Sequence, residues 1–206
     1  MHKGLSRDLL LKGLNLLLFC SLTIFAWADD QMTLRPNGVG TNTNLSVYPS
    51  GANWAAVDDV TSDSDTTYVY NATTSYVTDT YNIPDFIGRG TINSVTVYAV
   101  VKRVASGSPL SHLAYVKVGL YANSTWYAGS QNVLTTSYTT YSSTWTGDPS
   151  IPPQEPPVLN WTWEAINNLQ IGISLKGYTD IYGSQTAKCT QVYAVVDYNY
   201  GQVIIF

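Results

Sequence analysis

Apolar and polar residues alternate along most of the chain, in short runs separated by turn-forming residues. Alternation with a period of two predicts β-strands that bury one face. The clearest predicted strands are Thr91–Ala105, Leu113–Ala122, Ser124–Ser130, Val133–Thr146, Leu169–Gly177 and Ala187–Tyr200, and the shorter ones are Thr33–Arg35, Leu45–Tyr48, Thr67–Asn71 and Ser75–Tyr81. About ten short strands with regular turns predict an all-β antiparallel sandwich in the form of a jelly roll.

The string VYAVV occurs twice, at Val97–Val101 and Val192–Val196. In both copies alternation puts small aliphatic residues on one face and tyrosine with valine on the other. Neither strand therefore has a fully polar side. Both are predicted to be central strands whose second face is partly covered by a loop, by the Trp161–Leu169 segment or by another subunit.

One segment follows a helical spacing instead. Trp163, Ile166 and Leu169 recur at intervals that place them on one side of a helix, and Thr162 precedes them as an N-cap. We expect one short helix near residues 163–169 in an otherwise all-β chain.

The first 28 residues have the pattern of a targeting segment. Basic residues precede an apolar run at Leu14–Phe25, and the small residues of AWA end at Ala28. This order is typical of a secretory signal peptide that is cleaved before Asp29, and the apolar run is too short to span a bilayer comfortably. The mature chain would be residues 29–206, a single secreted domain without stable membrane insertion.

Composition narrows the functions further. After cleavage, seven Lys and Arg remain against thirteen Asp and Glu, a net charge of −6, which disfavours nucleic acid as a partner.

Cys189 would be the only cysteine, so it cannot form an intrachain disulfide, and we expect a buried core residue. His112 would be the only histidine, which excludes a histidine-rich metal site. Glu155 and Glu164 do not lie where a catalytic carboxylate pair is expected, and the protein is predicted not to be an enzyme.

Four aspartates, Asp58, Asp59, Asp63 and Asp65, lie within eight residues of a chain that has few charges elsewhere. Their spacing lacks the glycine and the final glutamate of an EF-hand loop. Two interpretations stay open: an irregular calcium-binding loop, or turns capped and solvated by short polar side chains. The second is favoured, and neither gives the loop a catalytic role.

A possible binding surface is suggested by aromatic residues. The predicted strand Val133–Thr146 has almost no aliphatic side chains, with Tyr141 and Trp145 on one face and Tyr138 on the other. Together with Trp126, these residues could form a platform on which sugar rings stack. The alternative is that they only cover neighbouring strands.

The C-terminal residues Val203, Ile204, Ile205 and Phe206 are apolar. This segment could be the last strand of its own sheet, or it could pair with the open sheet edge of another subunit. Its alternation also resembles the end of an outer-membrane barrel, but Val133–Thr146 lacks the apolar lipid-facing row of such strands.

The order W-x-x-V-D-D, then WTWEAINNLQ, then QVYAVVDY resembles modules of uncharacterised secreted, environmental bacterial and phage-fibre proteins. The resemblance covers Asn37–Tyr200. It implies a sandwich used for structure or attachment and brings no catalytic residues. The leading hypothesis is a secreted structural or adhesive subunit that assembles with itself into a cell-surface or extracellular filament. The alternative is a carbohydrate-binding module with an aromatic platform and calcium, and a small outer-membrane barrel ranks third.

Overall fold

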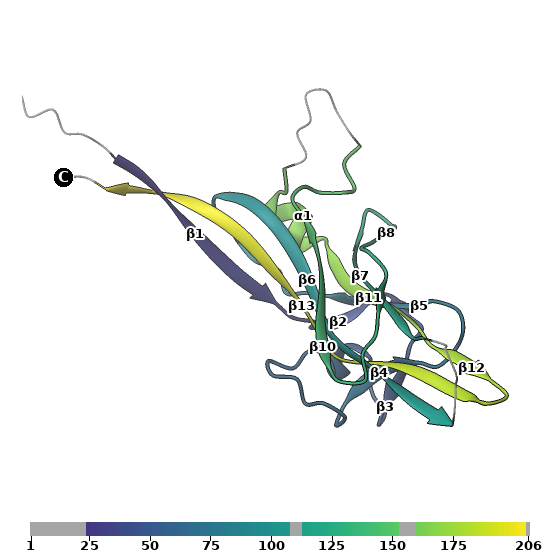
Figure 1. Cartoon of the computed structure of the whole chain (residues 1–206). Helices are drawn as coiled ribbons and strands as arrows, with labels where there is room; N and C mark the ends of the chain where they lie inside the picture. Colours follow the sequence, from purple (N-terminus) through teal and green to yellow (C-terminus); the bar gives the residue numbers. More distant parts are fainter. Residues whose placement is uncertain (1–23, 108–112, 153–159, 205–206) are drawn as a thin grey trace, which may run out of the picture.

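A computed structural model describes residues 24–107, 113–152 and 160–204, which form two antiparallel sheets packed face to face (Figure 1). Sheet A has the order β10 (Thr139–Trp145), β6 (Thr91–Gly107), β13 (Gly183–Ile204), β4 (Tyr68–Asn71), β3 (Ser46–Tyr48), and both β1 (Ile24–Leu34) and β12 (Tyr178–Asp180) pair with β13. Sheet B has the order β2 (Gly38–Thr43), β5 (Val77–Asn82), β11 (Gln170–Lys176), β7 (Tyr115–Ala122), β8 (Thr125–Ala128), and β9 (Asn132–Val133) pairs with β7.

The chain crosses repeatedly between the two sheets. From β4 it passes to β5, back to β6, on to the β7–β8 hairpin, back to β10, then to β11 and finally to β13. The strands β4, β13, β6 and β10 thereby face β5, β11, β7 and β8. This is the strand order of a jelly roll, so the predicted fold class is confirmed.

The core explains why these strands keep their register. The two VYAVV segments are neighbours, with Val97 opposite Ala194 and Ala99 opposite Val192, and all four side chains are fully buried. A slip of one residue would turn every one of these side chains to the outer face. Because full burial of a valine contributes about 1.5–3 kcal/mol, such a slip is strongly disfavoured. Both segments are central strands of sheet A, as predicted.

The predicted short helix is present as α1 (Trp163–Asn167), the one α-helix among the described residues. The Thr162 hydroxyl accepts a hydrogen bond from the Ala165 N–H at 3.0 Å, which makes Thr162 the expected N-cap. Ile166 is fully buried, and the indole N–H of the preceding Trp161 donates to the carbonyl of Trp145 at 3.1 Å. The helix thus covers one end of the core.

The structure corrects one predicted strand and adds two. The range Val133–Thr146 is not a single strand, because β9 belongs to sheet B and β10 to sheet A. Between them Leu134 is buried, and its N–H donates to the carbonyl of Ala114 at 3.0 Å, so the chain turns across the core at this point. The short strands β2 and β12 were not predicted. The predicted strand Thr33–Arg35 is the end of the longer β1.

The C-terminal segment pairs within its own chain. β1 runs antiparallel to the end of β13, with Phe25 opposite Val203 and Ile24 opposite Ile204, and the two strands extend together from the body of the sandwich (Figure 1). Ile205 and Phe206 lie outside the described residues. The expected cleavage before Asp29 would remove the first part of β1.

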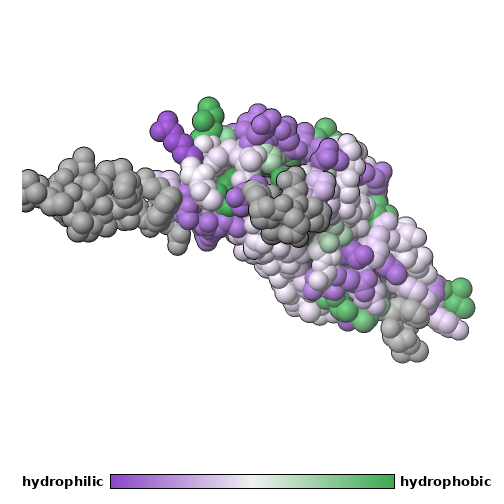
Figure 2. All heavy atoms as spheres, turned by 90° about the horizontal axis from the view of Figure 1, so that it is seen from above, coloured by the Kyte–Doolittle hydropathy of each residue, from purple (hydrophilic) through white to green (hydrophobic). Residues whose placement is uncertain are grey.

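The surface carries no large continuous apolar area in the view from above, where hydrophobic residues form small separate patches among hydrophilic and intermediate ones (Figure 2). Within the described ranges, no helix is both long and apolar enough to cross a membrane.

Candidate functional site

The outer surface of sheet B combines aromatic and polar side chains. We define the B face as the outward-facing residues on β5, β11, β7 and β8 together with Tyr76, which directly precedes β5. Pairing registers, and for Tyr76 its contacts with Lys117 and Lys176, place these members on it: Tyr76, Thr78, Thr80, Asn82, Tyr115, Lys117, Gly119, Tyr121, Trp126, Ala128, Gln170, Gly172, Ser174 and Lys176. None of them is a branched aliphatic residue, whereas the opposite side of the same strands carries the valines, leucines and isoleucines of the core.

One row of the B face crosses four neighbouring strands. Gln170 lies opposite both Asn82 and Tyr121, and Tyr121 lies opposite Trp126. Because adjacent strands are about 4.8 Å apart, the row is about 14 Å long. It therefore offers an amide, a second amide, a phenol and an indole over more than the length of one sugar ring.

Glycine in the next row determines where Trp126 lies. Gly172 and Gly119 are paired there, and a Cβ atom on Gly119 would come within 2.5 Å of Cη2 of the Trp126 indole and 2.6 Å of the Tyr127 carbonyl oxygen. The indole can cover the sheet only because position 119 has no side chain. Trp126 is half-buried in this arrangement.

Hydrogen bonds fix Gln170 in the same row. Its Oε1 accepts from the Thr41 N–H and the Thr80 hydroxyl, both at 2.8 Å, and its Nε2 donates to the Thr41 hydroxyl at 3.1 Å. On the adjacent strand, Asn82 donates to the carbonyl of Val39 at 2.8 Å. These contacts tie β2 to the edge of the B face and hold both amides in place.

The other end of the B face carries two lysines and two tyrosines. The ammonium nitrogens of Lys117 and Lys176 lie 4.7 Å and 5.8 Å from the centre of the Tyr76 ring, and that of Lys176 lies 5.7 Å from the centre of the Tyr115 ring. The Tyr76 hydroxyl donates to Oε1 of Gln131 at 2.7 Å. Burial, with a smaller effect from Tyr115, raises the pKa of Tyr76 above its usual range, so this phenol stays a hydrogen-bond donor at neutral pH.

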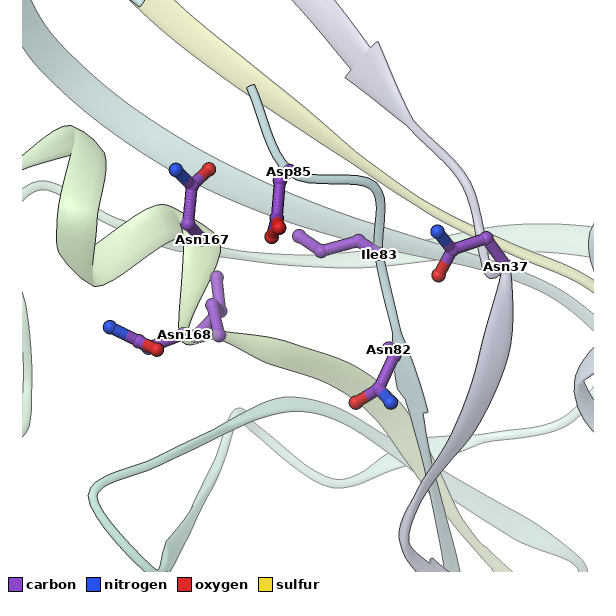
Figure 3. A pocket seen from close by; sticks show the side chains of 7 residues that line it. Asn37, Asn82, Ile83, Asp85, Asn167 and Asn168 are labelled. Atoms are coloured by element: carbon purple, nitrogen blue, oxygen red, sulfur yellow. The ribbon is translucent and has the colours of Figure 1, made fainter. Parts of the chain in front are cut away.

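A polar pocket of about 400 Å³ adjoins the B face at Asn82. Its lining consists of amides, one carboxylate and two aliphatic side chains, from Asn37, Asn82, Ile83, Asp85, Asn167, Asn168 and Leu169. The Asn167 amide bonds both the N–H and the carbonyl of Phe86, at 2.9 and 3.2 Å, and is thereby fixed. The Asp85 side chain points into the space between Asn167 and Ile83 (Figure 3).

The structure does not assemble the four aromatic residues expected to form a sugar platform. Tyr141 and Trp145 share one side of β10, as alternation predicts, but this side packs against the core, and the Tyr141 hydroxyl donates to the carbonyl of Val133 at 3.0 Å. Tyr138 contacts the aspartate-rich loop on the outside of sheet A. Trp126 alone lies on the B face.

The aspartate-rich loop uses its carboxylates for internal contacts. Asp63 accepts hydrogen bonds from the hydroxyls of Thr190 and Thr67 at 2.6 and 2.8 Å. Asp65 forms ion pairs with Lys102 at 2.5 Å and Lys188 at 3.5 Å, and the hydrogen bond from Lys102 holds its pKa below the usual range.

The backbone carbonyl of Asp59 accepts a 2.6 Å hydrogen bond from the Gln191 amide, and burial followed by repulsion from Asp63 and Asp58 raises the pKa of its side chain. In the parts of the chain that the structure describes, no three His, Cys, Asp or Glu residues are grouped so that they could hold a metal. The contacts of this loop fasten it to sheet A.

Sequence reasoning missed a buried carboxylate. Asp79 is fully buried on β5, where Oδ1 accepts from the N–H groups of Asn44 and Leu45 at 2.6 and 2.8 Å, and Oδ2 accepts from the amide of Asn53 at 2.6 Å. Burial raises its pKa, although these hydrogen bonds oppose the shift. The only signal in the sequence is an acidic residue at a core-facing position of an alternating strand.

Cys189 is a core residue, as predicted. Cys189 is fully buried in β13, and burial raises the pKa of its thiol to about 12. A thiol in this state is not a nucleophile at neutral pH.

No family model and no curated protein matches the chain. Among solved structures it is similar to a family 11 carbohydrate-binding module from Clostridium thermocellum in complex with a β-1,3-1,4-mixed-linked tetrasaccharide, at 12% identity over 82% of this chain and 87% of that one, with a TM-score of 0.33. The family 11 module of the cellulosomal cellulase Lic26A-Cel5E of the same organism gives 10% identity, coverages of 85% and 89% and a TM-score of 0.32. A CBM4 structure gives 13% identity, coverages of 84% and 94% and a TM-score of 0.28.

Proposed function

We propose that the chain is a secreted glycan-binding module and that the B face is its binding surface. The observation that carries this proposal is the Trp126 indole lying over Gly119 within a surface that has no branched aliphatic residue. A sugar ring has apolar C–H faces and polar hydroxyl edges, so it needs an aromatic ring beside hydrogen-bonding side chains. Tyr121 and Gln170 provide such groups in the same row.

The shape of the site favours a linear oligosaccharide over a single sugar as the ligand. The row from Asn82 to Trp126 runs across four strands, and the asparagine-lined pocket continues from Asn82 at one end. A surface of this kind can contact several consecutive sugars, with the aromatic ring stacking on one of them and the amides bonding others. The role proposed is binding without catalysis.

The filament hypothesis has less support. Strand addition between subunits needs a segment without a partner. In the full chain Val203 and Ile204 pair with Phe25 and Ile24, and cleavage before Asp29 would remove both of these partners. Self-assembly through the end of β13 is therefore a second candidate function. Sedimentation analysis of the mature chain with and without residues 201–206 tests it: oligomers that are lost on truncation would support it, and a monomer in both cases would reject it.

Affinity electrophoresis of the mature chain through gels that contain soluble plant, microbial or animal polysaccharides tests the proposal. We expect at least one polysaccharide to retard the protein. The Trp126→Ala variant should weaken binding by about thirtyfold, because a central aromatic contact contributes about 2 kcal/mol.

The matched control is Tyr48→Ala, which removes an aromatic side chain that is 48% exposed on the outside of sheet A. It should bind as the unmodified protein does. Equal loss in both variants, or no retardation by any polysaccharide, would contradict the proposal.

A further inference from the structure

We infer that the B face binds an anionic glycan, whose carboxylate or sulfate groups contact Lys117 and Lys176. This inference rests on the function proposed above and specifies its ligand class. It starts from the placement of the two lysines, which lie on adjacent strands: Lys117 is opposite Ser174, and Lys176 is opposite Tyr115. They are therefore diagonal neighbours on the same face.

The two ammonium groups converge on one aromatic ring. Both lie within 6 Å of the centre of the Tyr76 ring, at 4.7 and 5.8 Å, and Tyr115 contacts Lys176 from the other side. Contacts with ring faces orient a cation without neutralising it. The cluster thus holds two positive charges beside one tyrosine ring, on half-buried side chains.

No acidic side chain balances these charges within the described residues. Neither lysine has an ion-pair partner there, whereas Lys102 and Lys188 on sheet A share Asp65. The B face itself contains neither Asp nor Glu. Two adjacent like charges repel each other, and an anionic group placed between them would relieve this repulsion and form charge-assisted hydrogen bonds.

The net charge of the protein argues against nonspecific electrostatic attraction of acidic polymers. The chain has a net charge of −4, so its long-range field repels polyanions. Attraction of an acidic polymer must come from a local site, and the lysine pair provides one. An ammonium group binds carboxylate and sulfate alike as a point charge, so the geometry defines an anionic group without choosing between the two.

The distance between the lysine pair and Trp126 sets the minimum length of a glycan that contacts both. Tyr115 and Tyr121 mark the two ends along β7, six residues apart, which corresponds to about 20 Å of extended strand. A glycan that stacks on Trp126 and reaches the lysines must therefore contain several sugars.

Two pairs of polymers that differ mainly in charge test this inference: polygalacturonate against its fully methyl-esterified form, and dextran sulfate against dextran. We expect the charged member of at least one pair to bind more tightly than its uncharged counterpart, and increasingly so at low salt. The pair that shows the preference distinguishes carboxylate from sulfate recognition. Lys117→Gln/Lys176→Gln should weaken binding of the charged polymer by about tenfold or more.

The control variant is Lys188→Gln, which removes one lysine that lies 4.0 Å from the ring centre of Tyr68 on the other sheet. It should not change binding. The conservative variant Lys117→Arg/Lys176→Arg should retain the preference for charge, which separates loss of charge from loss of packing. Circular dichroism confirms that each variant is folded.

Three results would overturn the inference. Equal binding of charged and uncharged polymers, with binding still lost in Trp126→Ala, rejects the anionic ligand and leaves the proposed function intact. Tight binding of a charged polymer that survives the double lysine-to-glutamine change places recognition elsewhere. Absence of binding to every polysaccharide rejects both the inference and the proposed function.

Discussion

On the outer side of sheet A, Lys102 and Lys188 both form ion pairs with Asp65, whereas on the B face Lys117 and Lys176 have no carboxylate partner among the described residues. Each lysine lies near a tyrosine ring. The two surfaces therefore use the same residue types differently. On sheet A the lysines are paired with a carboxylate of the fold, and on the B face the two lysines could pair with the anionic ligand that we propose.

The aromatic residues show the same difference. Tyr98 and Tyr193 stack on the outside of sheet A with ring centres 4.9 Å apart, and Arg35 lies over Tyr193. Trp126 lies over Gly119, where the neighbouring position has no side chain. Rings that stack on each other complete a surface, whereas a ring over a glycine leaves one side for another ring to contact. We therefore propose a structural role for the outside of sheet A and a binding role for the B face.

The largest effect on stability is expected at Asp79, whose side chain joins β5 of sheet B to the segment that leads into β3 of sheet A. Asp79→Ala should lower the free energy of unfolding by about 3 kcal/mol, because it leaves the buried N–H of Leu45, the partly buried N–H of Asn44 and the Asn53 amide without their acceptor. Urea denaturation measures this change. The control is Asp85→Ala, which removes an exposed carboxylate and should change the free energy of unfolding by less than about 0.5 kcal/mol. Equal losses of stability in the two variants would show that the hydrogen bonds of Asp79 do not stabilise the fold.

A smaller effect, on glycan binding, is expected from a substitution at Gly119 in the B face. Gly119→Ala places a methyl group against the Trp126 indole, so we expect glycan binding to fall by about tenfold and tryptophan fluorescence to shift. Gly107→Ala is the control, since its Cβ atom would also meet a backbone oxygen, that of Tyr182, but at the β6–β13 pairing of sheet A; it should leave glycan binding unchanged. Unchanged glycan binding in Gly119→Ala would show that the position of the Trp126 indole does not determine the affinity for the glycan.

The smallest effect is expected on the outside of sheet A. Asp65→Asn should cost about 0.5 kcal/mol of stability at neutral pH, since its two ion pairs are partly exposed, and should leave glycan binding unchanged. Because the pKa of Asp65 is lowered from its ordinary value of 3.8, the folded state favours the charged form. The stability that it contributes is present above pH 3.8 and is lost as the pH falls through the lower pKa of the folded state.

Thermal unfolding of Asp65→Asn and the unmodified protein at several pH values measures this difference. The two unfolding curves should converge at the acidic end. A difference that stays constant from neutral to acidic pH would show that the ion pairs are not its source.

Alternation was enough to predict the fold because the strands of the core bury one side throughout. It identified the inward residues of β6 and β13, and the N-cap signal of Thr162 located α1. It could not decide which side of β10 faces inward, because that edge strand has few aliphatic residues to mark its buried face. Tyr141 and Trp145 share a face as predicted, but that face contacts the core.

The B face could not be predicted for a different reason. Its central row joins Asn82, Gln170, Tyr121 and Trp126 from strands that are far apart in the sequence and adjacent only in the sheet order. Hairpin proximity brings Trp126 next to Tyr121, but neither composition nor spacing shows that β11 lies between β5 and β7. The aspartate cluster was conspicuous in the sequence, yet its contacts are internal.

The most direct test of the central claim is an NMR titration of the uniformly labelled mature chain with a soluble oligosaccharide of whichever glycan the protein binds. We predict that the indole N–H of Trp126 and the amides of Tyr121, Gln170 and Asn82 shift together, while those of Tyr98 and Tyr193 stay in place. Shifts confined to the outside of sheet A, with an unchanged Trp126 signal, would contradict the assignment of binding to the B face.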